Sequence, residues 1–118
     1  MPGRHDSTVA SFLPLTPVVF EILVSLSSED RHGYSILTDV RSRAGEALRP
    51  GSLYRALNRL LDEGLVEEVE ERPDPDLDDE RRRYYRLTTL GLKVTRAEAD
   101  RLEAQLGRAR AVLVARRR

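Results

Sequence analysis

Two segments in the first half of the chain carry apolar residues at the spacing of amphipathic helices. The first is expected to begin at Thr16-Pro17, because threonine caps a helix N-terminus well and proline suits the first turn. A polar break over residues 27–31 separates it from a second helix, expected over residues 33–44. The apolar residues that these two helices carry are Val19, Phe20, Leu23, Leu26, Tyr34, Ile36, Leu37 and Val40.

Residues 50–64 hold the clearest pattern, with four leucines on one face of a third predicted helix. Ser52 is a candidate N-cap, and Gly64 suits the left-handed position after the last turn. At about 100° per residue, the polar side chains fall on the opposite face. The leucines are Leu53, Leu57, Leu60 and Leu61, and the outward residues are Arg55, Asn58, Arg59 and Asp62. The pattern fits an ordinary surface helix. It also fits a DNA-recognition helix, because Arg pairs with guanine and Asn with adenine.

The pattern changes after Gly64. Residues 65–70 and 84–88 are expected to be strands, although glutamate is a poor strand former in the first of them. The intervening residues 72–80 hold two prolines and many acids, which favours a loop. A hairpin with a long tip is the simplest interpretation. Thr88 or Thr89 then caps a final helix that runs to about residue 115.

Three helices, a hairpin and a long helix, in this order, are typical of a winged helix-turn-helix, whose third helix enters the DNA major groove. The predicted fold class is therefore α+β, mostly α, with a long C-terminal dimerisation helix. The predicted domains are a flexible N-terminal arm over residues 1–13, a winged helix-turn-helix DNA-binding domain over 14–88 with its wing at 65–88, and a C-terminal dimerisation helix with a basic tail over 89–118.

Apolar residues of the final helix repeat at spacings of four, three and four, which is a coiled-coil-like seam. The residues of this seam are Leu102, Leu106, Ala109 and Leu113. The seam extends beyond the compact unit, so little of the same chain remains for it to pack on. We therefore expect a homodimer, in which two recognition helices lie about one DNA turn apart.

The formal net charge is zero, with 20 basic and 20 acidic residues, but the charges are segregated. Residues 67–80 carry about −8, whereas residues 81–118 carry about +9. DNA affinity depends on the charge at the contact surface, so a neutral total does not exclude a nucleic-acid partner.

Several classes of protein are not expected from this composition. The chain has no cysteine, so disulfides and thiolate metal sites are excluded. We find no signal peptide and no apolar run that could span a bilayer, which predicts a cytoplasmic protein without a membrane partner. No catalytic or metal-ligand pattern surrounds His5 or His32, and the acidic loop lacks the glycine and glutamate positions of a calcium loop. We expect neither an enzyme nor a cofactor nor a metal.

Four segments together resemble the PadR-type transcriptional regulators, over roughly residues 15–92. They are His32-Gly33-Tyr34-Ser35-Ile36, Pro50-Gly51-Ser52-Leu53-Tyr54, Leu60-Leu61-Asp62-Glu63-Gly64-Leu65, and Arg82-Arg83-Tyr84-Tyr85-Arg86-Leu87-Thr88 followed by Gly91. The resemblance implies a dimeric DNA-binding repressor of the short C-terminal-helix subtype, often released by a small-molecule effector. Some relatives stack flat aromatic compounds on a tryptophan at the dimer interface, and this chain has no tryptophan. The effector therefore stays unidentified.

The candidate DNA-binding residues come from three parts of the predicted domain. They are Ser52, Tyr54, Arg55, Asn58 and Arg59 in the third helix, Arg81, Arg82 and Arg83 in the wing, and Tyr34 in the second helix. Arg55 stands where many members of the family have proline, which suggests an added contact. Each residue also has a structural interpretation: the helix face can be merely solvated, Ser52 can be only a cap, and both tyrosines can be packing residues.

The wing arginines alternate between two faces of their strand, so not all three can point toward DNA. They can instead pair with the acidic residues 67–71 across the hairpin. The acidic tip itself should be repelled by DNA. Two hypotheses result: a sequence-specific regulator, a repressor that binds a palindromic operator as a homodimer, or a winged-helix protein–protein interaction module without DNA binding.

Overall fold

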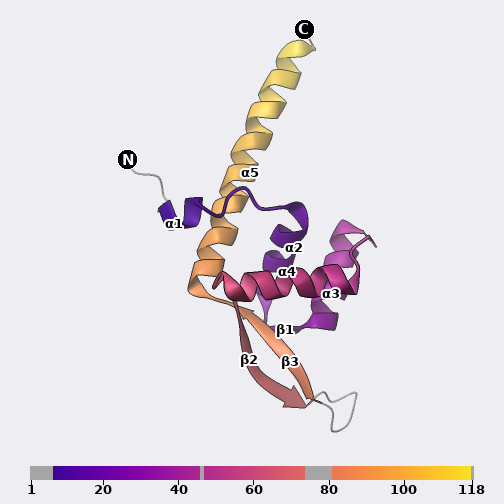
Figure 1. The fold of residues 1–118 in the computed structure, drawn as a ribbon. Coiled ribbons are helices and arrows are strands. Elements are labelled where there is room, and N and C mark those ends of the chain that lie inside the picture. Colours follow the sequence, from indigo (N-terminus) through magenta and orange to yellow (C-terminus); the bar gives the residue numbers. More distant parts are fainter. Residues whose placement is uncertain (1–6, 46, 74–80, 118) are drawn as a thin grey trace.

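A computed structural model describes residues 7–45, 47–73 and 81–117 of the chain, without the side chains of residues 70–73, 81 and 82. Its elements, in chain order, are α1 (Ser7–Ala10), α2 (Pro17–Ser28), β1 (Arg31–His32), α3 (Gly33–Ala44), α4 (Pro50–Asp62), β2 (Val66–Pro73), β3 (Arg81–Leu87) and α5 (Thr89–Arg116). Three helices pack beside a small antiparallel sheet, and the long α5 rises out of this body (Figure 1). The winged helix-turn-helix prediction is confirmed.

Most predicted helix ends are confirmed by capping contacts. The Thr16 hydroxyl accepts a hydrogen bond from the Val19 amide at the start of α2, and the Thr88 hydroxyl accepts one from the Gly91 amide at the start of α5. The start of α4 differs from the prediction. Arg49 is its N-cap residue, without a side-chain cap, and Ser52 lies inside the first turn. Pro50 begins the helix earlier because its fixed φ angle suits the first helical position.

The sheet has the strand order β1-β3-β2 and contains one strand that the sequence pattern did not predict. In β1, Arg31 lies opposite Tyr85 and His32 lies opposite Tyr84. A two-residue strand is too short for an alternating pattern, so the segment was predicted only as a polar break. The predicted hairpin is confirmed by β2 and β3, with an irregularity in register between Val69 and Arg72.

The start of the chain differs from the predicted flexible arm. In the described part of that arm, α1 contacts α5 and Val9 is only 1% exposed. Phe12 and Leu13 also pack against the core. Three scattered apolar residues do not form a recognisable period, so burial of this segment against α5 was not predictable from spacing.

The leucine face of α4 lies in the centre of the core, as predicted. Leu53 and Leu57 are fully buried, and Leu60 is 2% exposed. They pack with the buried faces of α2 and α3 and with the first turns of α5. The buried residues from these neighbours include Ile22, Leu23, Ile36, Val40 and Val94. The recognition-helix candidate is therefore fixed to the body along its whole apolar face.

A close junction joins the end of α4, the base of the wing and the start of α5. Gly64 has a φ of 79°, which confirms its predicted left-handed conformation. The Thr88 hydroxyl donates to the Gly64 carbonyl oxygen at 2.6 Å, and the Thr88 amide donates to the Leu65 carbonyl oxygen at 3.1 Å. A Cβ atom on Gly91 would overlap the carbonyl group of Leu65. The junction therefore allows no side chain at Gly91.

A buried carboxylate ties the segment before α2 to α5. The side chain of Glu98 is 2% exposed and receives hydrogen bonds from Arg101 Nε at 2.6 Å and Arg101 Nη2 at 2.9 Å. The Leu15 amide donates to the same carboxylate at 3.1 Å. Hydrogen bonding from Arg101, together with the Leu15 amide, lowers the pKa of Glu98 although its burial acts in the opposite direction.

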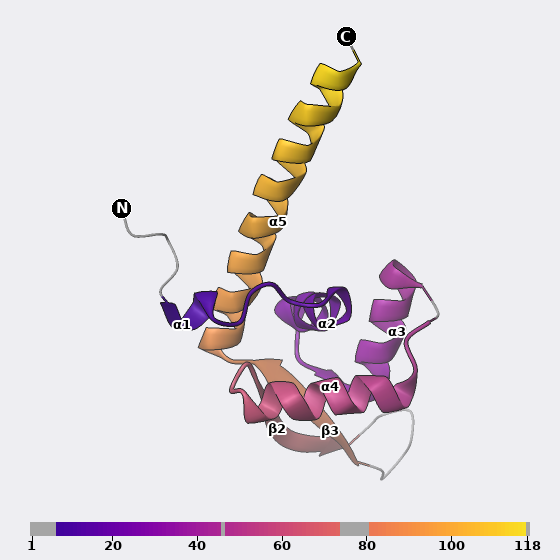
Figure 2. The same ribbon diagram turned by 45° about the horizontal axis from the view of Figure 1, so that its top comes forward.

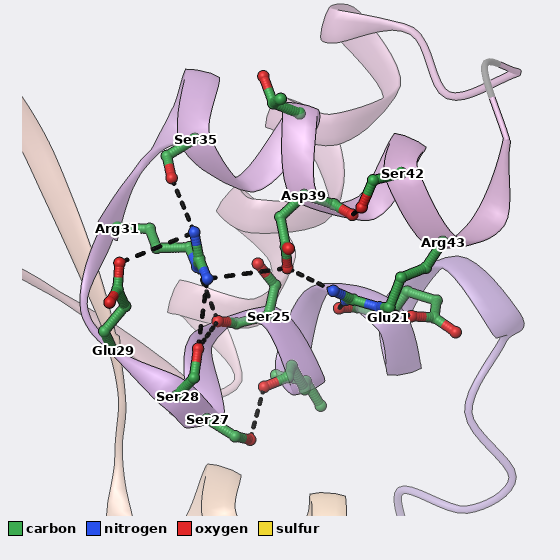
Figure 3. Close-up of polar contacts among 12 residues, drawn as sticks. Glu21, Ser25, Ser27, Ser28, Glu29, Arg31, Ser35, Asp39, Ser42 and Arg43 are labelled. Carbon is green, nitrogen blue, oxygen red and sulfur yellow. Dashed lines mark hydrogen bonds and ion pairs between the residues drawn. The ribbon is translucent and has the colours of Figure 1, made fainter.

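Polar contacts between α2 and α3 fix the angle of the helix pair that precedes α4 (Figure 3). Arg31 Nε donates to the Ser25 carbonyl oxygen at 2.9 Å, and Arg43 Nε donates to Glu21 Oε1 at 2.9 Å. Arg43 Nη1 also donates to Asp39 Oδ2 at 2.5 Å, and this hydrogen bond is the main cause of the lowered pKa of Asp39. The side chains of Arg31 and Arg43 therefore help to hold α2 and α3 together.

The second half of α5 leaves the body, and α4 and the wing lie on the side away from its C-terminal end (Figures 1 and 2). Every described residue from 103 onward is exposed. Among the described residues, no helix is long and apolar enough to cross a membrane.

We predict that Gly91→Ala lowers the free energy of unfolding by about 1–3 kcal/mol, because the added Cβ meets backbone that cannot rotate away. The matched control is Gly107→Ala on the same helix, where a Cβ meets nothing within 4 Å. The control should stabilise the protein by about 0.5–1 kcal/mol. Urea unfolding at one protein concentration measures both values. Equal effects of the two substitutions would contradict the close junction.

We predict that Glu98→Gln lowers stability by about 1–3 kcal/mol at pH 7, because charge-assisted hydrogen bonds to Arg101 are lost. The folded pKa of Glu98 lies below its ordinary value of 4.5, so the native contribution is fully present above that pH. It disappears as the pH falls through the folded pKa. Unfolding curves of both proteins should therefore converge in acid. Glu67→Gln, which breaks an exposed ion pair with Arg86, is the control and should have a much smaller effect. A difference that persists unchanged to pH 2 would refute this account.

Candidate nucleic-acid interface

The face of α4 opposite its buried leucines is polar and open to solvent. Arg55, Asn58 and Arg59 are exposed, and Tyr54 is 44% exposed. The prediction that these side chains point outward is confirmed. Because the leucine face is held in the core, the outward face has a fixed orientation relative to the body.

Both arginines of this face make only local contacts at the surface. Arg55 Nη2 donates to the Ser52 hydroxyl at 3.2 Å, and Arg59 Nε donates to Glu63 Oε2 at 3.3 Å. The Arg59 side chain is 79% exposed. Exposed pairs of this kind contribute little to stability, and a guanidinium carries five N–H donors. Both side chains therefore have donors available for a ligand.

The outward residues of α4 divide between two concave surfaces. Tyr54 and Asn58 line a polar cleft of about 390 Å³, which the start of α3 and strand β3 complete. Arg55 and Arg59 line a separate groove of about 420 Å³, together with the segment between α1 and α2. The sequence pattern predicted one polar face and did not predict this division, which depends on which elements lie beside α4.

The cleft depends on close packing between Tyr54 and Gly33. A Cβ atom on Gly33 would lie 2.7 Å from Cζ of Tyr54 and would overlap its hydroxyl. Tyr54 thus crosses the N-terminus of α3 and is half packed and half exposed. Tyr34, from the first turn of α3, lines the same cleft and is 63% exposed. The packing alternative for Tyr34 does not hold, because its position on α3 turns away from the helix's buried stripe.

Arg83 is the wing arginine that reaches this cleft. Its guanidinium lies 3.4 Å from Glu68 and remains 57% exposed, so the alternative of pairing across the hairpin holds for this residue. Tyr85, two residues on, is buried, and burial raises the pKa of its hydroxyl. The side chains of Arg81 and Arg82, and the acidic tip at residues 74–80 with its calcium-loop alternative, lie outside the described part of the structure.

The structure adds Arg49 to the candidates. It is exposed and occupies the N-cap position of α4, next to the helix end that contacts nucleic acid in helix-turn-helix proteins. The assignment of Ser52 as N-cap left Arg49 in the preceding turn. Pro50 is the signal in the sequence that points to Arg49, because proline is common at the first helical position and the residue before it is then the N-cap. In the parts of the chain that the structure describes, no group of acidic, histidine or cysteine side chains could hold a metal ion.

The sequence from residue 22 to residue 97 matches the model of a family described as the transcriptional regulator PadR-like family. The chain belongs to the PadR-like family. The matched region begins in α2 and ends within the first half of α5, so it contains α3, α4 and the wing. The expected family and its regulatory rather than enzymatic role are confirmed.

Solved structures support the PadR-like assignment. A PadR family transcription regulator from Clostridium difficile is 26% identical with a TM-score of 0.72, and the match covers 83% of this chain and 99% of that one. RosR from H. salinarum is 29% identical with a TM-score of 0.61, covering 88% of this chain and 93% of that one. An uncharacterised 37.1 kDa protein in transposon TN4556 of Streptomyces fradiae is 34% identical over 87 residues. That match covers 74% of the PadR-like chain, which spans 23% of this curated relative.

We predict that Gly33→Ala destabilises the protein by roughly 1 kcal/mol in the presence of Tyr54, because the tyrosine must leave its position. In a Tyr54→Ala background the same substitution should have almost no further effect. Urea unfolding of the four proteins gives the coupling energy of this pair. Additive effects of the two substitutions would contradict the packing of Tyr54 on Gly33.

Proposed function

We propose that this PadR-like regulator is a sequence-specific repressor that binds a palindromic DNA operator as a homodimer. The observation that carries the proposal is the outward face of α4, where Arg55, Asn58 and Arg59 are exposed opposite a fully buried leucine stripe. A rigidly held helix with these side chains suits the major groove, because Arg and Asn each bind a base edge with two hydrogen bonds.

Residues around the cleft next to α4 are suited to the phosphate backbone. Tyr34 and Tyr54 carry hydroxyls in the cleft, and Arg83 adds a charge from the wing. Ser52 adds a hydroxyl from the first turn of α4. Such contacts fix the register of the protein on DNA, whereas the α4 side chains carry specificity. We extend the backbone role to Arg49, and to Arg81 and Arg82 of the wing. The acidic tip stays away from the phosphates, because like charges repel.

Dimerisation through the seam of α5 gives the protein a two-fold symmetry that matches a palindromic operator. Leu106 is 51% exposed and Leu113 is 62% exposed, although both are large apolar residues. With Leu102 and Ala109 they form a stripe that a second copy can cover. In this proposal residues 14–88 bind DNA and residues 89–118 dimerise. A small-molecule effector of unidentified chemistry regulates binding, as the family resemblance implies.

The test begins with selection of bound duplexes from a random-sequence DNA pool. We predict that Arg55→Ala combined with Arg59→Ala weakens binding to the selected duplex and flattens its salt dependence. A positive charge that enters the groove also displaces condensed counterions, so the loss of both arginines should flatten the slope of log K against log salt by up to about 2. The control is Arg108→Ala, an exposed arginine on α5 that removes the same type of charge far from α4. This control should leave affinity nearly unchanged.

Two results would overturn the proposal. If the double variant binds as tightly as the unmodified protein, with the same salt slope, α4 is not the recognition helix. If the pool yields no bound duplex at low or moderate salt while a stable protein partner is recovered, the protein-interaction alternative replaces the repressor.

A further inference from the structure

The groove between α4 and the segment that joins α1 to α2 is partly apolar and partly charged. Its volume of about 420 Å³ lies within the range of roughly 300–1,000 Å³ that is typical of small-molecule sites. The proposed DNA contacts use the two arginines at its edge and none of its apolar side chains. The apolar part of the groove is therefore left without a role in DNA binding.

Helix α4 presents two rows of side chains to the groove. Arg55, Arg59 and Glu63 follow one another at intervals of four residues and form a charged edge. Ala56 and Leu60, one position further on, form an apolar row beside it. At a rise of about 1.5 Å per residue, the charged edge is about 12 Å long. The groove therefore suits an elongated ligand that lies along α4, and the small side chain of Ala56 leaves room for it.

The opposite wall offers apolar side chains on a backbone that is held in place. Phe12, Leu15 and Val19 line the groove and are only partly buried. The Phe12 amide donates to the Val9 carbonyl oxygen at 3.1 Å, and the Leu15 amide donates to the buried carboxylate of Glu98 at 3.1 Å. Covering this apolar surface with a ligand is favourable, and little ordering of the wall is needed first.

The charges along the edge favour an anionic ligand. Two arginines and one carboxylate, that of Glu63, line the groove. Arg59 Nε lies 3.3 Å from Glu63 Oε2, whereas Arg55 donates to the neutral hydroxyl of Ser52. The lining residues therefore carry one positive charge in excess, at the Arg55 end. A carboxylate or phosphate suits a guanidinium well, because it can accept two parallel hydrogen bonds.

We propose that this groove binds an amphipathic anion of small-molecule size. Its acidic head group lies on Arg55 and Arg59, and its apolar body lies between the Ala56 row and the wall that Phe12 and Leu15 form. A bound anion occupies the same two guanidiniums that the proposed function assigns to DNA, so anion and DNA weaken each other's binding. The inference rests on the proposed function and gives its unidentified effector a site and a chemical class.

Binding to the protein without DNA tests the site directly. Three probes share an octyl chain and differ in the head group: octanoate, octanol and octyltrimethylammonium, each used below its micelle concentration. We expect octanoate to bind about tenfold more tightly than the other two, because only its head group pairs with the arginines. Nuclear magnetic resonance titration of the ¹⁵N-labelled full chain measures the three affinities. Equal affinity for octanoate and octyltrimethylammonium overturns the proposal.

Two substitutions locate the bound probe. Ala56→Leu fills the groove and should weaken octanoate binding at least about fivefold, whereas Ala104→Leu, on an exposed part of α5, should leave it unchanged. Arg55→Ala should weaken octanoate binding about five- to tenfold and octanol binding much less, with Arg108→Ala as its control. Octanoate binding that neither Ala56→Leu nor Arg55→Ala weakens overturns the proposal.

A competition experiment tests the coupling to DNA. Saturating octanoate should weaken binding of the selected duplex about tenfold in the unmodified protein. Ala56→Leu should still bind the duplex and should respond much less to octanoate. Octanoate that binds in the groove without releasing the duplex supports the site and counts against DNA contact by α4, so the two failures are distinguishable. Light scattering should give Ala56→Leu the molar mass of the unmodified protein. A lower mass makes the groove a contact between copies and overturns the proposal.

Discussion

The junction between Gly64, Leu65, Thr88 and Gly91 sets the relative positions of all three functional parts of the protein. Helix α4 ends there, both strands of the wing start or finish there, and α5 begins there. Thr88 donates hydrogen bonds to both Gly64 and Leu65, and Gly91 brings α5 against the Leu65 backbone. This contact therefore fixes the orientation of α4 relative to the direction of α5. In the proposed homodimer, this junction sets the position of each α4 relative to the α5 of its own chain.

The arginines of the chain divide into two groups according to their surroundings. Arg31, Arg43 and Arg101 are bonded to carboxylates or carbonyl oxygens that hold helices together. Arg55 and Arg59 make only local contacts on an open face. The arginines on the open face are therefore not used to hold helices together, although Arg59 is paired with Glu63 at the surface.

The fold could be predicted where apolar residues recur at a regular spacing over several turns, or where a capping residue marks the end of a helix. Thr16, Thr88 and Gly64 marked their boundaries correctly, and the leucines of α4 identified its buried face. Short elements such as β1 and α1 could not be predicted, because two to four residues do not form a period. The site was predictable as a set of outward residues. The division of that set between two concave surfaces, and the packing of Tyr54 on Gly33, depend on tertiary neighbours that no local pattern reveals.

The outward face of α4 is proposed to contact DNA directly. The most direct measurement is a nuclear magnetic resonance titration of the ¹⁵N-labelled protein with a selected duplex, observing side-chain signals. If α4 contacts DNA, the Asn58 amide and the Nε–H signals of Arg55 and Arg59 shift on binding. The Arg101 signal, which reports a guanidinium held by Glu98, should stay in place. Binding that leaves the Asn58, Arg55 and Arg59 signals unchanged would contradict the account.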